Sequence, residues 1–255
     1  MRKHIIIPCV IAAFVAGACG DRHSQSGDAN AAEVTTVTPE SSSVSTATGP
    51  TSTQPVSFES ANAAFTEKRY DEAVRLFTTY TTDKPDNVWG FYMLGLSAWK
   101  TGDRDAAVRA FKQALEQDST HVKSRLNLSR VLIEQGKAQD ALPYVEGVVT
   151  IDSTSNEAYR LLGRVKRELD DSTGAIEAFK KAIVLDERDA WSMNNLAKVY
   201  IGQGRYEDAL GPLARAIEID SAIAAFHTNL GRALEHTADR SRLAEAFVEQ
   251  VKTWR

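Results

Sequence analysis

Cysteine is nearly absent from this chain of 255 residues: Cys9 and Cys19 are the only two, and both lie near its start. The rest of the chain therefore contains no disulfide and no thiol nucleophile. The five histidines are scattered, and no His–Glu pair has the spacing of metal ligands. No glycine-rich phosphate loop and no base–nucleophile set can be recognised. These absences predict a protein that is not an enzyme, with no catalytic residue, no metal site and no cofactor.

An excess of positive charge is also missing. Lys and Arg number 30 against 34 Asp and Glu, which gives a formal net charge of -4. A general nucleic-acid binder would carry a basic surface, so nucleic acid is not an expected partner. Hydrophobic residues (43%) and charged residues (25%) occur in the proportions of an ordinary soluble protein.

The chain has no long hydrophobic run, since the apolar stretch from Ile5 to Val15 is too short to span a bilayer comfortably. With its basic start and the small residues after it, this stretch predicts a signal peptide over residues 1–18. The small residues before Cys19 resemble the lipobox of bacterial lipoproteins, with Ala16 where that family more often has Leu. The resemblance implies a lipid on Cys19 and a place in the bacterial cell envelope, facing the periplasm or the exterior, with the lipid as the only membrane contact. An ordinary signal peptide cleaved at the same bond would instead give a free periplasmic or secreted protein.

Residues 19–55 contain little that could form a core. Ser and Thr dominate from 35 to 53, and no cation occurs between Arg22 and Lys68. Such a segment cannot bury enough apolar surface to offset the entropy of ordering it, so a disordered Ser/Thr-rich linker is expected. It would act as a tether between the lipid and the part of the chain that follows.

The rest of the chain repeats itself every 34 residues. From Val88 to Thr120, two helix-length apolar patterns flank a Gly-Asp turn, and each copy has small and bulky residues at set points of its second helix. The small ones are Ala73, Ala107, Ala141, Ala175 and Ala209; the bulky ones are Phe77, Phe111, Val145, Phe179 and Leu213. Small residues let two paired helices approach closely, and the bulky residue fills the space beside them. A fixed period of this length indicates helix pairs that bury their apolar faces by stacking.

This pattern resembles the tetratricopeptide repeat (TPR) family. The matching residues are Leu94, Gly95, Ala107, Phe111 and Ala114, with Tyr70 and Tyr206 opening second helices. The resemblance implies an all-α fold, a right-handed α-solenoid of about six helix pairs over residues 56–255. The copies lie near 54–87, 88–121, 122–155, 156–189, 190–223 and 224–255. First helices are expected to begin near Val56, Val88, Val122, Asn156, Ala190 and Ala224, and second helices near Tyr70, Arg104, Ala138, Ser172, Tyr206 and Arg240.

Two further positions of the repeat carry turn chemistry. The turn within a pair has glycine at one shared position, where a positive φ is expected after a helix: Gly102, Gly136 and Gly204. The break between copies has aspartate, which can bond backbone amides and end a helix: Asp118, Asp152, Asp186 and Asp220.

In the TPR family the first helices line the concave face of the solenoid, so the side chains that they present there are candidate binding residues. In the second copy these side chains are aromatic or apolar: Trp89, Tyr92, Leu96 and Trp99. An exposed apolar patch of this kind usually marks a binding site.

From the third copy on, the same face becomes polar and basic. Its candidate residues are Asn127, Arg130, Arg164, Asn195, Lys198, Asn229 and Arg232. The cations recur once per copy and predict a stripe for an acidic segment, while the asparagines resemble the asparagine ladder of the sugar-transferase TPR superhelix, with one rung missing. The alternative is a solvated helix face, because Glu134 and Glu168 stand four residues after Arg130 and Arg164 and could pair with them.

The TPR resemblance implies a non-catalytic scaffold or adaptor that binds a protein or peptide segment in the concave groove. Together with the lipobox resemblance, it implies a scaffold of the bacterial cell envelope. Two alternatives stay open: an assembly factor for an outer-membrane pore, pilus or barrel machine, or a regulator that recruits cell-wall enzymes. The sequence does not identify the partner or the oligomeric state.

Overall fold

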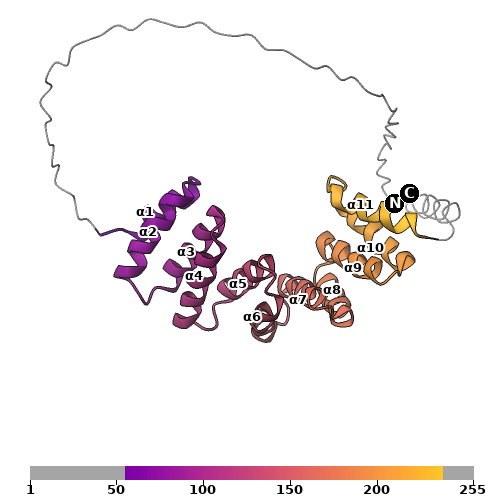
Figure 1. Ribbon diagram of the computed structural model, residues 1–255, viewed down its shortest axis with the longest axis horizontal. Coiled ribbons are helices and arrows are strands. Elements are labelled where there is room, and N and C mark those ends of the chain that lie inside the picture. The colour runs from indigo at the N-terminus through magenta and orange to yellow at the C-terminus, as the bar shows by residue number, and fades with distance from the viewer. Residues whose placement is uncertain (1–54, 238–255) are drawn as a thin grey trace, which may run out of the picture. The chain divides into compact units, whose positions relative to one another are not determined.

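The computed structural model describes residues 55–237, and within this range the chain forms eleven α-helices and no strand (Figure 1). The first five helices are α1 (Phe58–Thr66), α2 (Tyr70–Asp83), α3 (Val88–Thr101), α4 (Arg104–Gln117) and α5 (Val122–Glu134). The others are α6 (Ala138–Ile151), α7 (Asn156–Glu168), α8 (Ser172–Leu185), α9 (Ala190–Gly202), α10 (Tyr206–Ile219) and α11 (Ala224–Glu235). The signal peptide, Cys19, the linker up to residue 54 and the second helix of the sixth copy lie outside the described residues.

The predicted helix starts are confirmed from Tyr70 to Ala224, because each of these helices begins at the residue expected. The first helix is the exception: it begins at Phe58 and not near Val56. The reason is local, since the Ser57 side chain accepts the amide of Ser60 at 3.1 Å and so caps the helix at that point.

The packing positions of the repeat are fully buried. The five alanines from Ala73 to Ala209 and the bulky residues from Phe77 to Leu213 all have 0% exposure. Gly95 shows why a small residue is needed, because a Cβ there would come within 2.6 Å of the Phe111 ring. Gly163 stands in the same relation to Phe179. In each of these two pairs, the bulky residue of the second helix therefore packs directly against the glycine of the first helix.

The turn within each pair requires a left-handed backbone. Gly102, Gly136 and Gly204 have φ values of 88°, 72° and 71°, as expected. The equivalent positions in the first and fourth copies hold Lys68 and Asp170, which adopt φ values of 63° and 60° although they are not glycine. This conformation costs an L-residue about 1–2 kcal/mol, so these two turns are less favourable than the others.

The aspartates between copies end their helices as predicted. Each accepts the amide two residues further on: Asp118 from Thr120, Asp152 from Thr154, Asp186 from Arg188 and Asp220 from Ala222, at 2.9 to 3.0 Å. These bonds turn the chain from one helix pair into the next.

The helix pairs follow one another in chain order. Each second helix packs against its own first helix and against the first helix of the next copy. The first helices also contact one another from α3 through α5, α7 and α9 to α11, whereas contacts between successive second helices are sparse. The first helices thus form a continuous row on one side of the array, which we call the first-helix face. None of the described helices is both long and apolar enough to cross a membrane.

Candidate functional site

Trp89 is the most exposed of the predicted aromatic residues on the first-helix face, with 47% of its surface accessible. Its ring stands edge-on to Tyr92 at 5.5 Å and to His121 at 5.0 Å, and the Lys123 amine lies 5.1 Å from its centroid. These neighbours fix the orientation of the indole and leave about half of it facing solvent.

The other predicted aromatic and apolar residues are partly buried. Tyr92, Leu96 and Trp99 pack against the hydrophobic core beneath α3 and α5. Burial raises the pKa of the Tyr92 hydroxyl, and the Trp99 indole donates to Glu134 Oε2 at 3.1 Å. Much of the surface of these three side chains therefore packs between copies. A periodic sequence pattern alone does not distinguish such packing residues from residues that contact a ligand.

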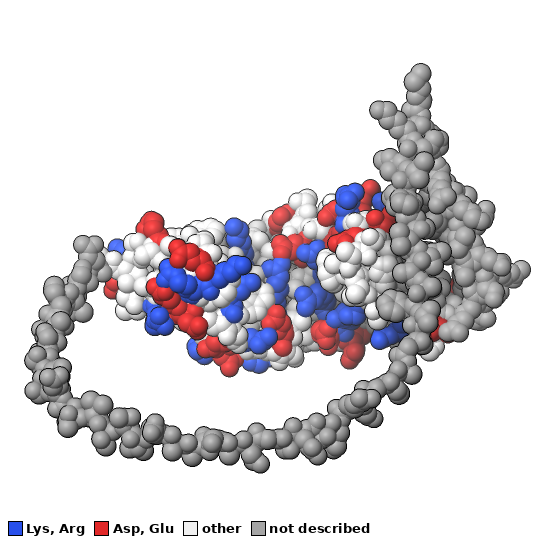
Figure 2. Space-filling view, turned by 90° about the horizontal axis from the view of Figure 1, so that it is seen from above, with Lys and Arg blue, Asp and Glu red and all other residues white. Residues whose placement is uncertain are grey.

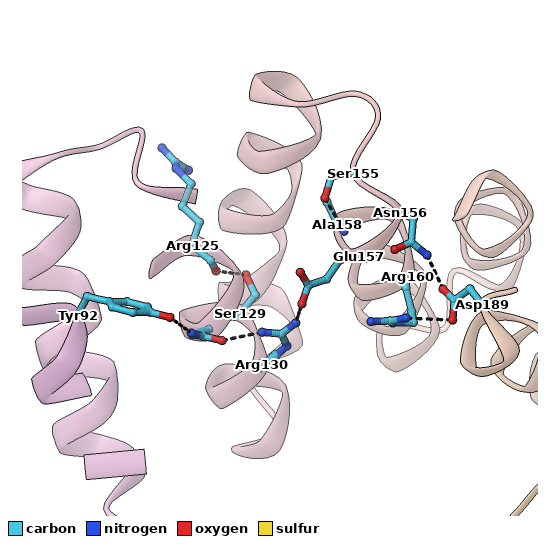
Figure 3. A network of polar contacts seen from close by, with 11 residues as sticks. Tyr92, Arg125, Ser129, Arg130, Ser155, Asn156, Glu157, Ala158, Arg160 and Asp189 are labelled. Carbon is cyan, nitrogen blue, oxygen red and sulfur yellow. Dashed lines mark hydrogen bonds and ion pairs between the residues drawn. The ribbon is translucent and has the colours of Figure 1, made fainter. Parts of the chain in front are cut away.

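A chain of polar contacts joins three first helices (Figure 3). The side-chain amide of Asn127 on α5 donates to the Tyr92 hydroxyl of α3 at 3.2 Å. Arg130 donates to the side-chain oxygen of Asn127, Oδ1, at 2.6 Å. Arg130 also forms an ion pair with Glu157 of α7. Asn127 and Arg130 are thus bonded within the protein and hold copies two, three and four together.

The pairs along single helices, which the alternative interpretation invoked, are not formed among the described residues. Glu134, four residues after Arg130, accepts instead from Arg104 Nε at 3.0 Å as well as from Trp99. Glu168, four residues after Arg164, accepts from Arg167 at 2.6 Å. In each case the carboxylate is taken by another donor.

A buried carboxylate links α7 to α9, and sequence reasoning missed it. The side chain of Asp189 is only 2% exposed and accepts from Arg160 Nη1 at 2.9 Å and from Asn156 Nδ2 at 2.7 Å (Figure 3). It also caps α9 by accepting the Ser192 amide at 3.0 Å and hydroxyl at 2.6 Å. The cap position could have been read from the sequence, but its partners come from the preceding copy.

The remaining cations of the predicted stripe form no ion pair within the described residues. Among residues 55–237, Arg164, Lys198 and Arg232 have no carboxylate oxygen within ion-pair distance. Burial, followed by the neighbouring Arg167, lowers the pKa of Arg164, while Glu168 and Glu134 act in the opposite direction. Burial and Arg167 likewise lower the pKa of Lys198, with smaller effects from Arg164 and Arg232 and an opposing one from Glu168. Like charges on α7, α9 and α11 therefore repel one another across this part of the face. Figure 2 shows Lys and Arg atoms on the side of the molecule seen from above, with Asp and Glu atoms among them.

The predicted asparagines do not form a continuous row of free amides. Asn229 donates to Asn194 Oδ1 at 2.7 Å, which joins α11 to α9, and Asn127 is held by Tyr92 and Arg130. Asn195 makes no side-chain hydrogen bond within the described residues, and none of its polar atoms is sealed from solvent. Of the three predicted asparagines, Asn195 alone has no side-chain hydrogen-bond partner within the described residues, although only 9% of its surface is exposed.

Trp191 is a second exposed tryptophan that the sequence analysis did not select. It lies on α9, is 49% exposed, and occupies the repeat position that Trp89 occupies three copies earlier. Its ring stands edge-on to the fully buried Phe226 at 5.2 Å. The 34-residue spacing was a sufficient signal to find it.

Within residues 55–237, no group of three His, Cys, Asp or Glu side chains is arranged to hold a metal ion. The described first-helix face combines two half-exposed tryptophans with three cations that form no ion pair within the described residues. Such a surface can bind apolar and acidic groups together.

Comparison with known proteins agrees with this architecture. Family models described as tetratricopeptide repeat match residues 92–156, 156–222 and 194–254, which is more than half of the chain. Among solved structures, MamA from Desulfovibrio magneticus RS-1 superposes with a TM-score of 0.60 at 22% identity, covering 64% of this chain and 92% of that chain. YrrB, described as a TPR protein with an unusual peptide-binding site, superposes with a TM-score of 0.58 at 19% identity, covering 67% and 88%. These likenesses establish the fold.

Curated relatives match over parts of their length. A DnaJ homolog subfamily C member 3 homolog of Dictyostelium discoideum is 25% identical over 171 residues, covering 61% of this chain and 34% of that protein. Human tetratricopeptide repeat protein 7B is 33% identical over 95 residues, covering 37% and 11%. The chain therefore spans about a third or less of these relatives, which share its repeats.

Proposed function

Because this chain belongs to the tetratricopeptide repeat family, whose helix-pair arrays serve as protein-interaction scaffolds, we propose that it is a non-catalytic adaptor that holds an extended segment of a partner protein on its first-helix face. The single observation that carries the proposal is the row of cations that form no ion pair within the described residues, Arg164, Lys198 and Arg232. A folded chain gains nothing from like charges held close together. An acidic segment of a partner would relieve their repulsion.

The other end of the same face would hold an apolar part of the partner. Trp89 presents about half of its surface there, and Tyr92, Leu96 and Trp99 present what packing leaves exposed. Between the two ends lies the amide of Asn195, which is 9% exposed and has no side-chain partner within the described residues, with Asn127 and Asn229 flanking it along the row. The fold neighbour YrrB is described as having an unusual peptide-binding site, which supports this mode of recognition.

We further propose that the scaffold works in the bacterial cell envelope, held by a lipid on Cys19 and a tether of residues 19–55. The support is the apolar run and the small residues before Cys19, together with the Ser/Thr-rich composition of the tether. If the signal peptide is cleaved without lipid attachment, the same scaffold would be periplasmic or secreted.

The test is a pull-down from bacterial membranes with the full-length chain as bait. The double reversal Arg164→Glu, Lys198→Glu should weaken capture of the partner at least about tenfold, because two contacts of roughly 1 kcal/mol each become repulsive. The loss should be larger at low than at high ionic strength, since salt screens exposed charges. The matched control is Lys112→Glu, Lys180→Glu, which makes the same change in net charge at exposed positions of the second helices.

Equal capture by both double variants, with unchanged helical content, would contradict the proposal and leave the cations as a solvated helix face. The identity of the captured proteins also distinguishes the two alternative functions. Pore, pilus or barrel subunits would indicate an assembly factor, and cell-wall synthases or hydrolases would indicate a recruiting regulator.

A further inference from the structure

Helix α9 presents an exposed apolar and an exposed basic side chain on one line, with a largely buried amide between them. Trp191, Asn195 and Lys198 stand at i, i+4 and i+7, so they share one face of the helix. The indole of Trp191 is 49% exposed, and the buried Phe226 ring behind it limits its movement. Seven residues of helix separate the indole from the Lys198 amine by about 10 Å along the axis.

The basic end of this line meets a second pair of cations on α7. Arg167 is near enough to lower the pKa of both Arg164 and Lys198, after the effect of burial. Within the described residues, the one carboxylate bonded to this group is that of Glu168, through Arg167 Nη2. Glu134 also acts on Arg164, but it is paired with Arg104. Three cations against one carboxylate leave a formal excess of two positive charges, which two further carboxylates would neutralise.

Arg167 also carries a polar atom without a partner. Its Nη1 is buried and has no hydrogen-bond acceptor among residues 55–237. A buried donor without an acceptor has lost its hydration and gained no hydrogen bond in return, which is unfavourable in free energy. A side-chain rotation that brings the guanidinium to a carboxylate would therefore be stabilising. Planar guanidinium groups bind carboxylates through two parallel N–H bonds, which suits Arg164 and Arg167 to this role.

We propose that this site, formed by Trp191, Asn195 and Lys198 of α9 with Arg164 and Arg167 of α7, recognises a short motif in the partner. The motif has an apolar side chain against Trp191 and a pair of neighbouring carboxylates against the three cations. An extended segment advances about 3.3 Å per residue, so the 10 Å between the two halves corresponds to a spacing of about three residues. This assignment rests on the proposed function and specifies what the first-helix face selects.

The experiment uses the purified full-length chain and a fluorescein-labelled probe, Gly-Ser-Phe-Gly-Gly-Glu-Glu-Gly-Ser, followed by fluorescence anisotropy. Three altered probes test the motif: Phe replaced by Ser, both Glu replaced by Gln, and Phe moved next to the first Glu at identical composition. Each altered probe should bind at least about fivefold more weakly than the original, a difference of about 1 kcal/mol.

Protein variants assign the two halves of the site. Trp191→Ala should weaken the original probe about tenfold at every ionic strength and remove the preference for Phe over Ser. Arg167→Gln should weaken it at least about threefold, mainly at low ionic strength, and remove part of the preference for Glu over Gln. Ile151→Ala on α6 and Arg109→Gln on α4 are the matched controls, because they remove a similarly exposed apolar group and an exposed cation from second helices.

Equal binding of the original and rearranged probes would overturn the proposed spacing. An equal loss in Trp89→Ala and Trp191→Ala would overturn the assignment of the apolar contact to α9. In either case, a partner pull-down that still depends on Arg164 and Lys198 would leave the proposed function standing. A pull-down that does not depend on Arg164 and Lys198 would contradict both the proposed function and the proposed motif.

Discussion

Replacement of Asp189 by alanine is the most informative test of how the array is held together. This carboxylate joins two copies, since it caps α9 through Ser192 and accepts from Arg160 and Asn156 of α7. Loss of the cap costs about 1 kcal/mol. Breaking a buried ion pair by removing one partner costs about 3–5 kcal/mol, and because Arg160 is 30% exposed and can regain water, we reduce this to about 2 kcal/mol. The expected loss is therefore about 3 kcal/mol.

Asp171→Ala is the matched comparison. Asp171 caps α8 through the Gly174 amide at 2.9 Å and pairs with Lys166 at 3.3 Å, but its side chain is 47% exposed. Its loss should cost about 1 kcal/mol, so the buried network accounts for a difference of about 2 kcal/mol between the two variants. Asp189→Asn keeps an acceptor for the cap and should lie between them.

Urea unfolding followed by circular dichroism gives these differences, and hydrogen exchange locates them. Because neighbouring repeats stabilise one another and an array need not unfold as one unit, exchange should rise in α7 and α9 before it rises elsewhere. A difference of less than about 0.5 kcal/mol between Asp189→Ala and Asp171→Ala would refute the reasoning, since it would mean that burial adds nothing to an ordinary cap.

Other substitutions test packing, turn geometry and processing. Phe179→Ala should cost about 3–5 kcal/mol in urea unfolding, because the fully buried ring is seated on Gly163; a loss below about 1 kcal/mol would contradict this packing. Lys68→Gly should raise the unfolding free energy by about 1 kcal/mol, since Lys68 has a φ of 63°; a destabilised variant would show that this strain is not relieved by glycine. Cys19→Ala should move the protein from the detergent phase to the aqueous phase in phase partitioning, and unchanged partitioning would exclude lipid attachment at Cys19.

The fold could be predicted from the sequence because the period of 34 residues fixes which side chains are small, bulky or turn-forming. Ala107, Phe111 and Gly102 take the burial and backbone conformation that their positions in the repeat require. Where the repeat departs from its pattern the prediction was weaker. The turn at Asp170 keeps the left-handed conformation without a glycine, because the register of the two flanking helices requires it.

The polar contacts of the candidate site could not be predicted in the same way. The alternative interpretation paired Arg130 with Glu134 on its own helix, but Arg130 pairs with Glu157 on the next first helix. Charge pairs within a helix can be read from sequence spacing, whereas pairs between copies depend on the separation and rotation of two helices. Trp191 is a different case, because the period of 34 residues alone shows that it occupies the same repeat position as Trp89.

The central claim is that the partner binds the first-helix face, and lysine labelling tests it most directly. Lys198 on α9 and Lys180 on α8 are both exposed, on first and second helices respectively. Burial and the neighbouring cations hold the pKa of Lys198 below its ordinary value, which favours its reaction with an acetylating reagent. Mass spectrometry of the free chain and of its complex with the captured partner should show slower acetylation of Lys198 in the complex and an unchanged rate at Lys180. Unchanged acetylation of Lys198, or protection of Lys180 alone, would contradict the account.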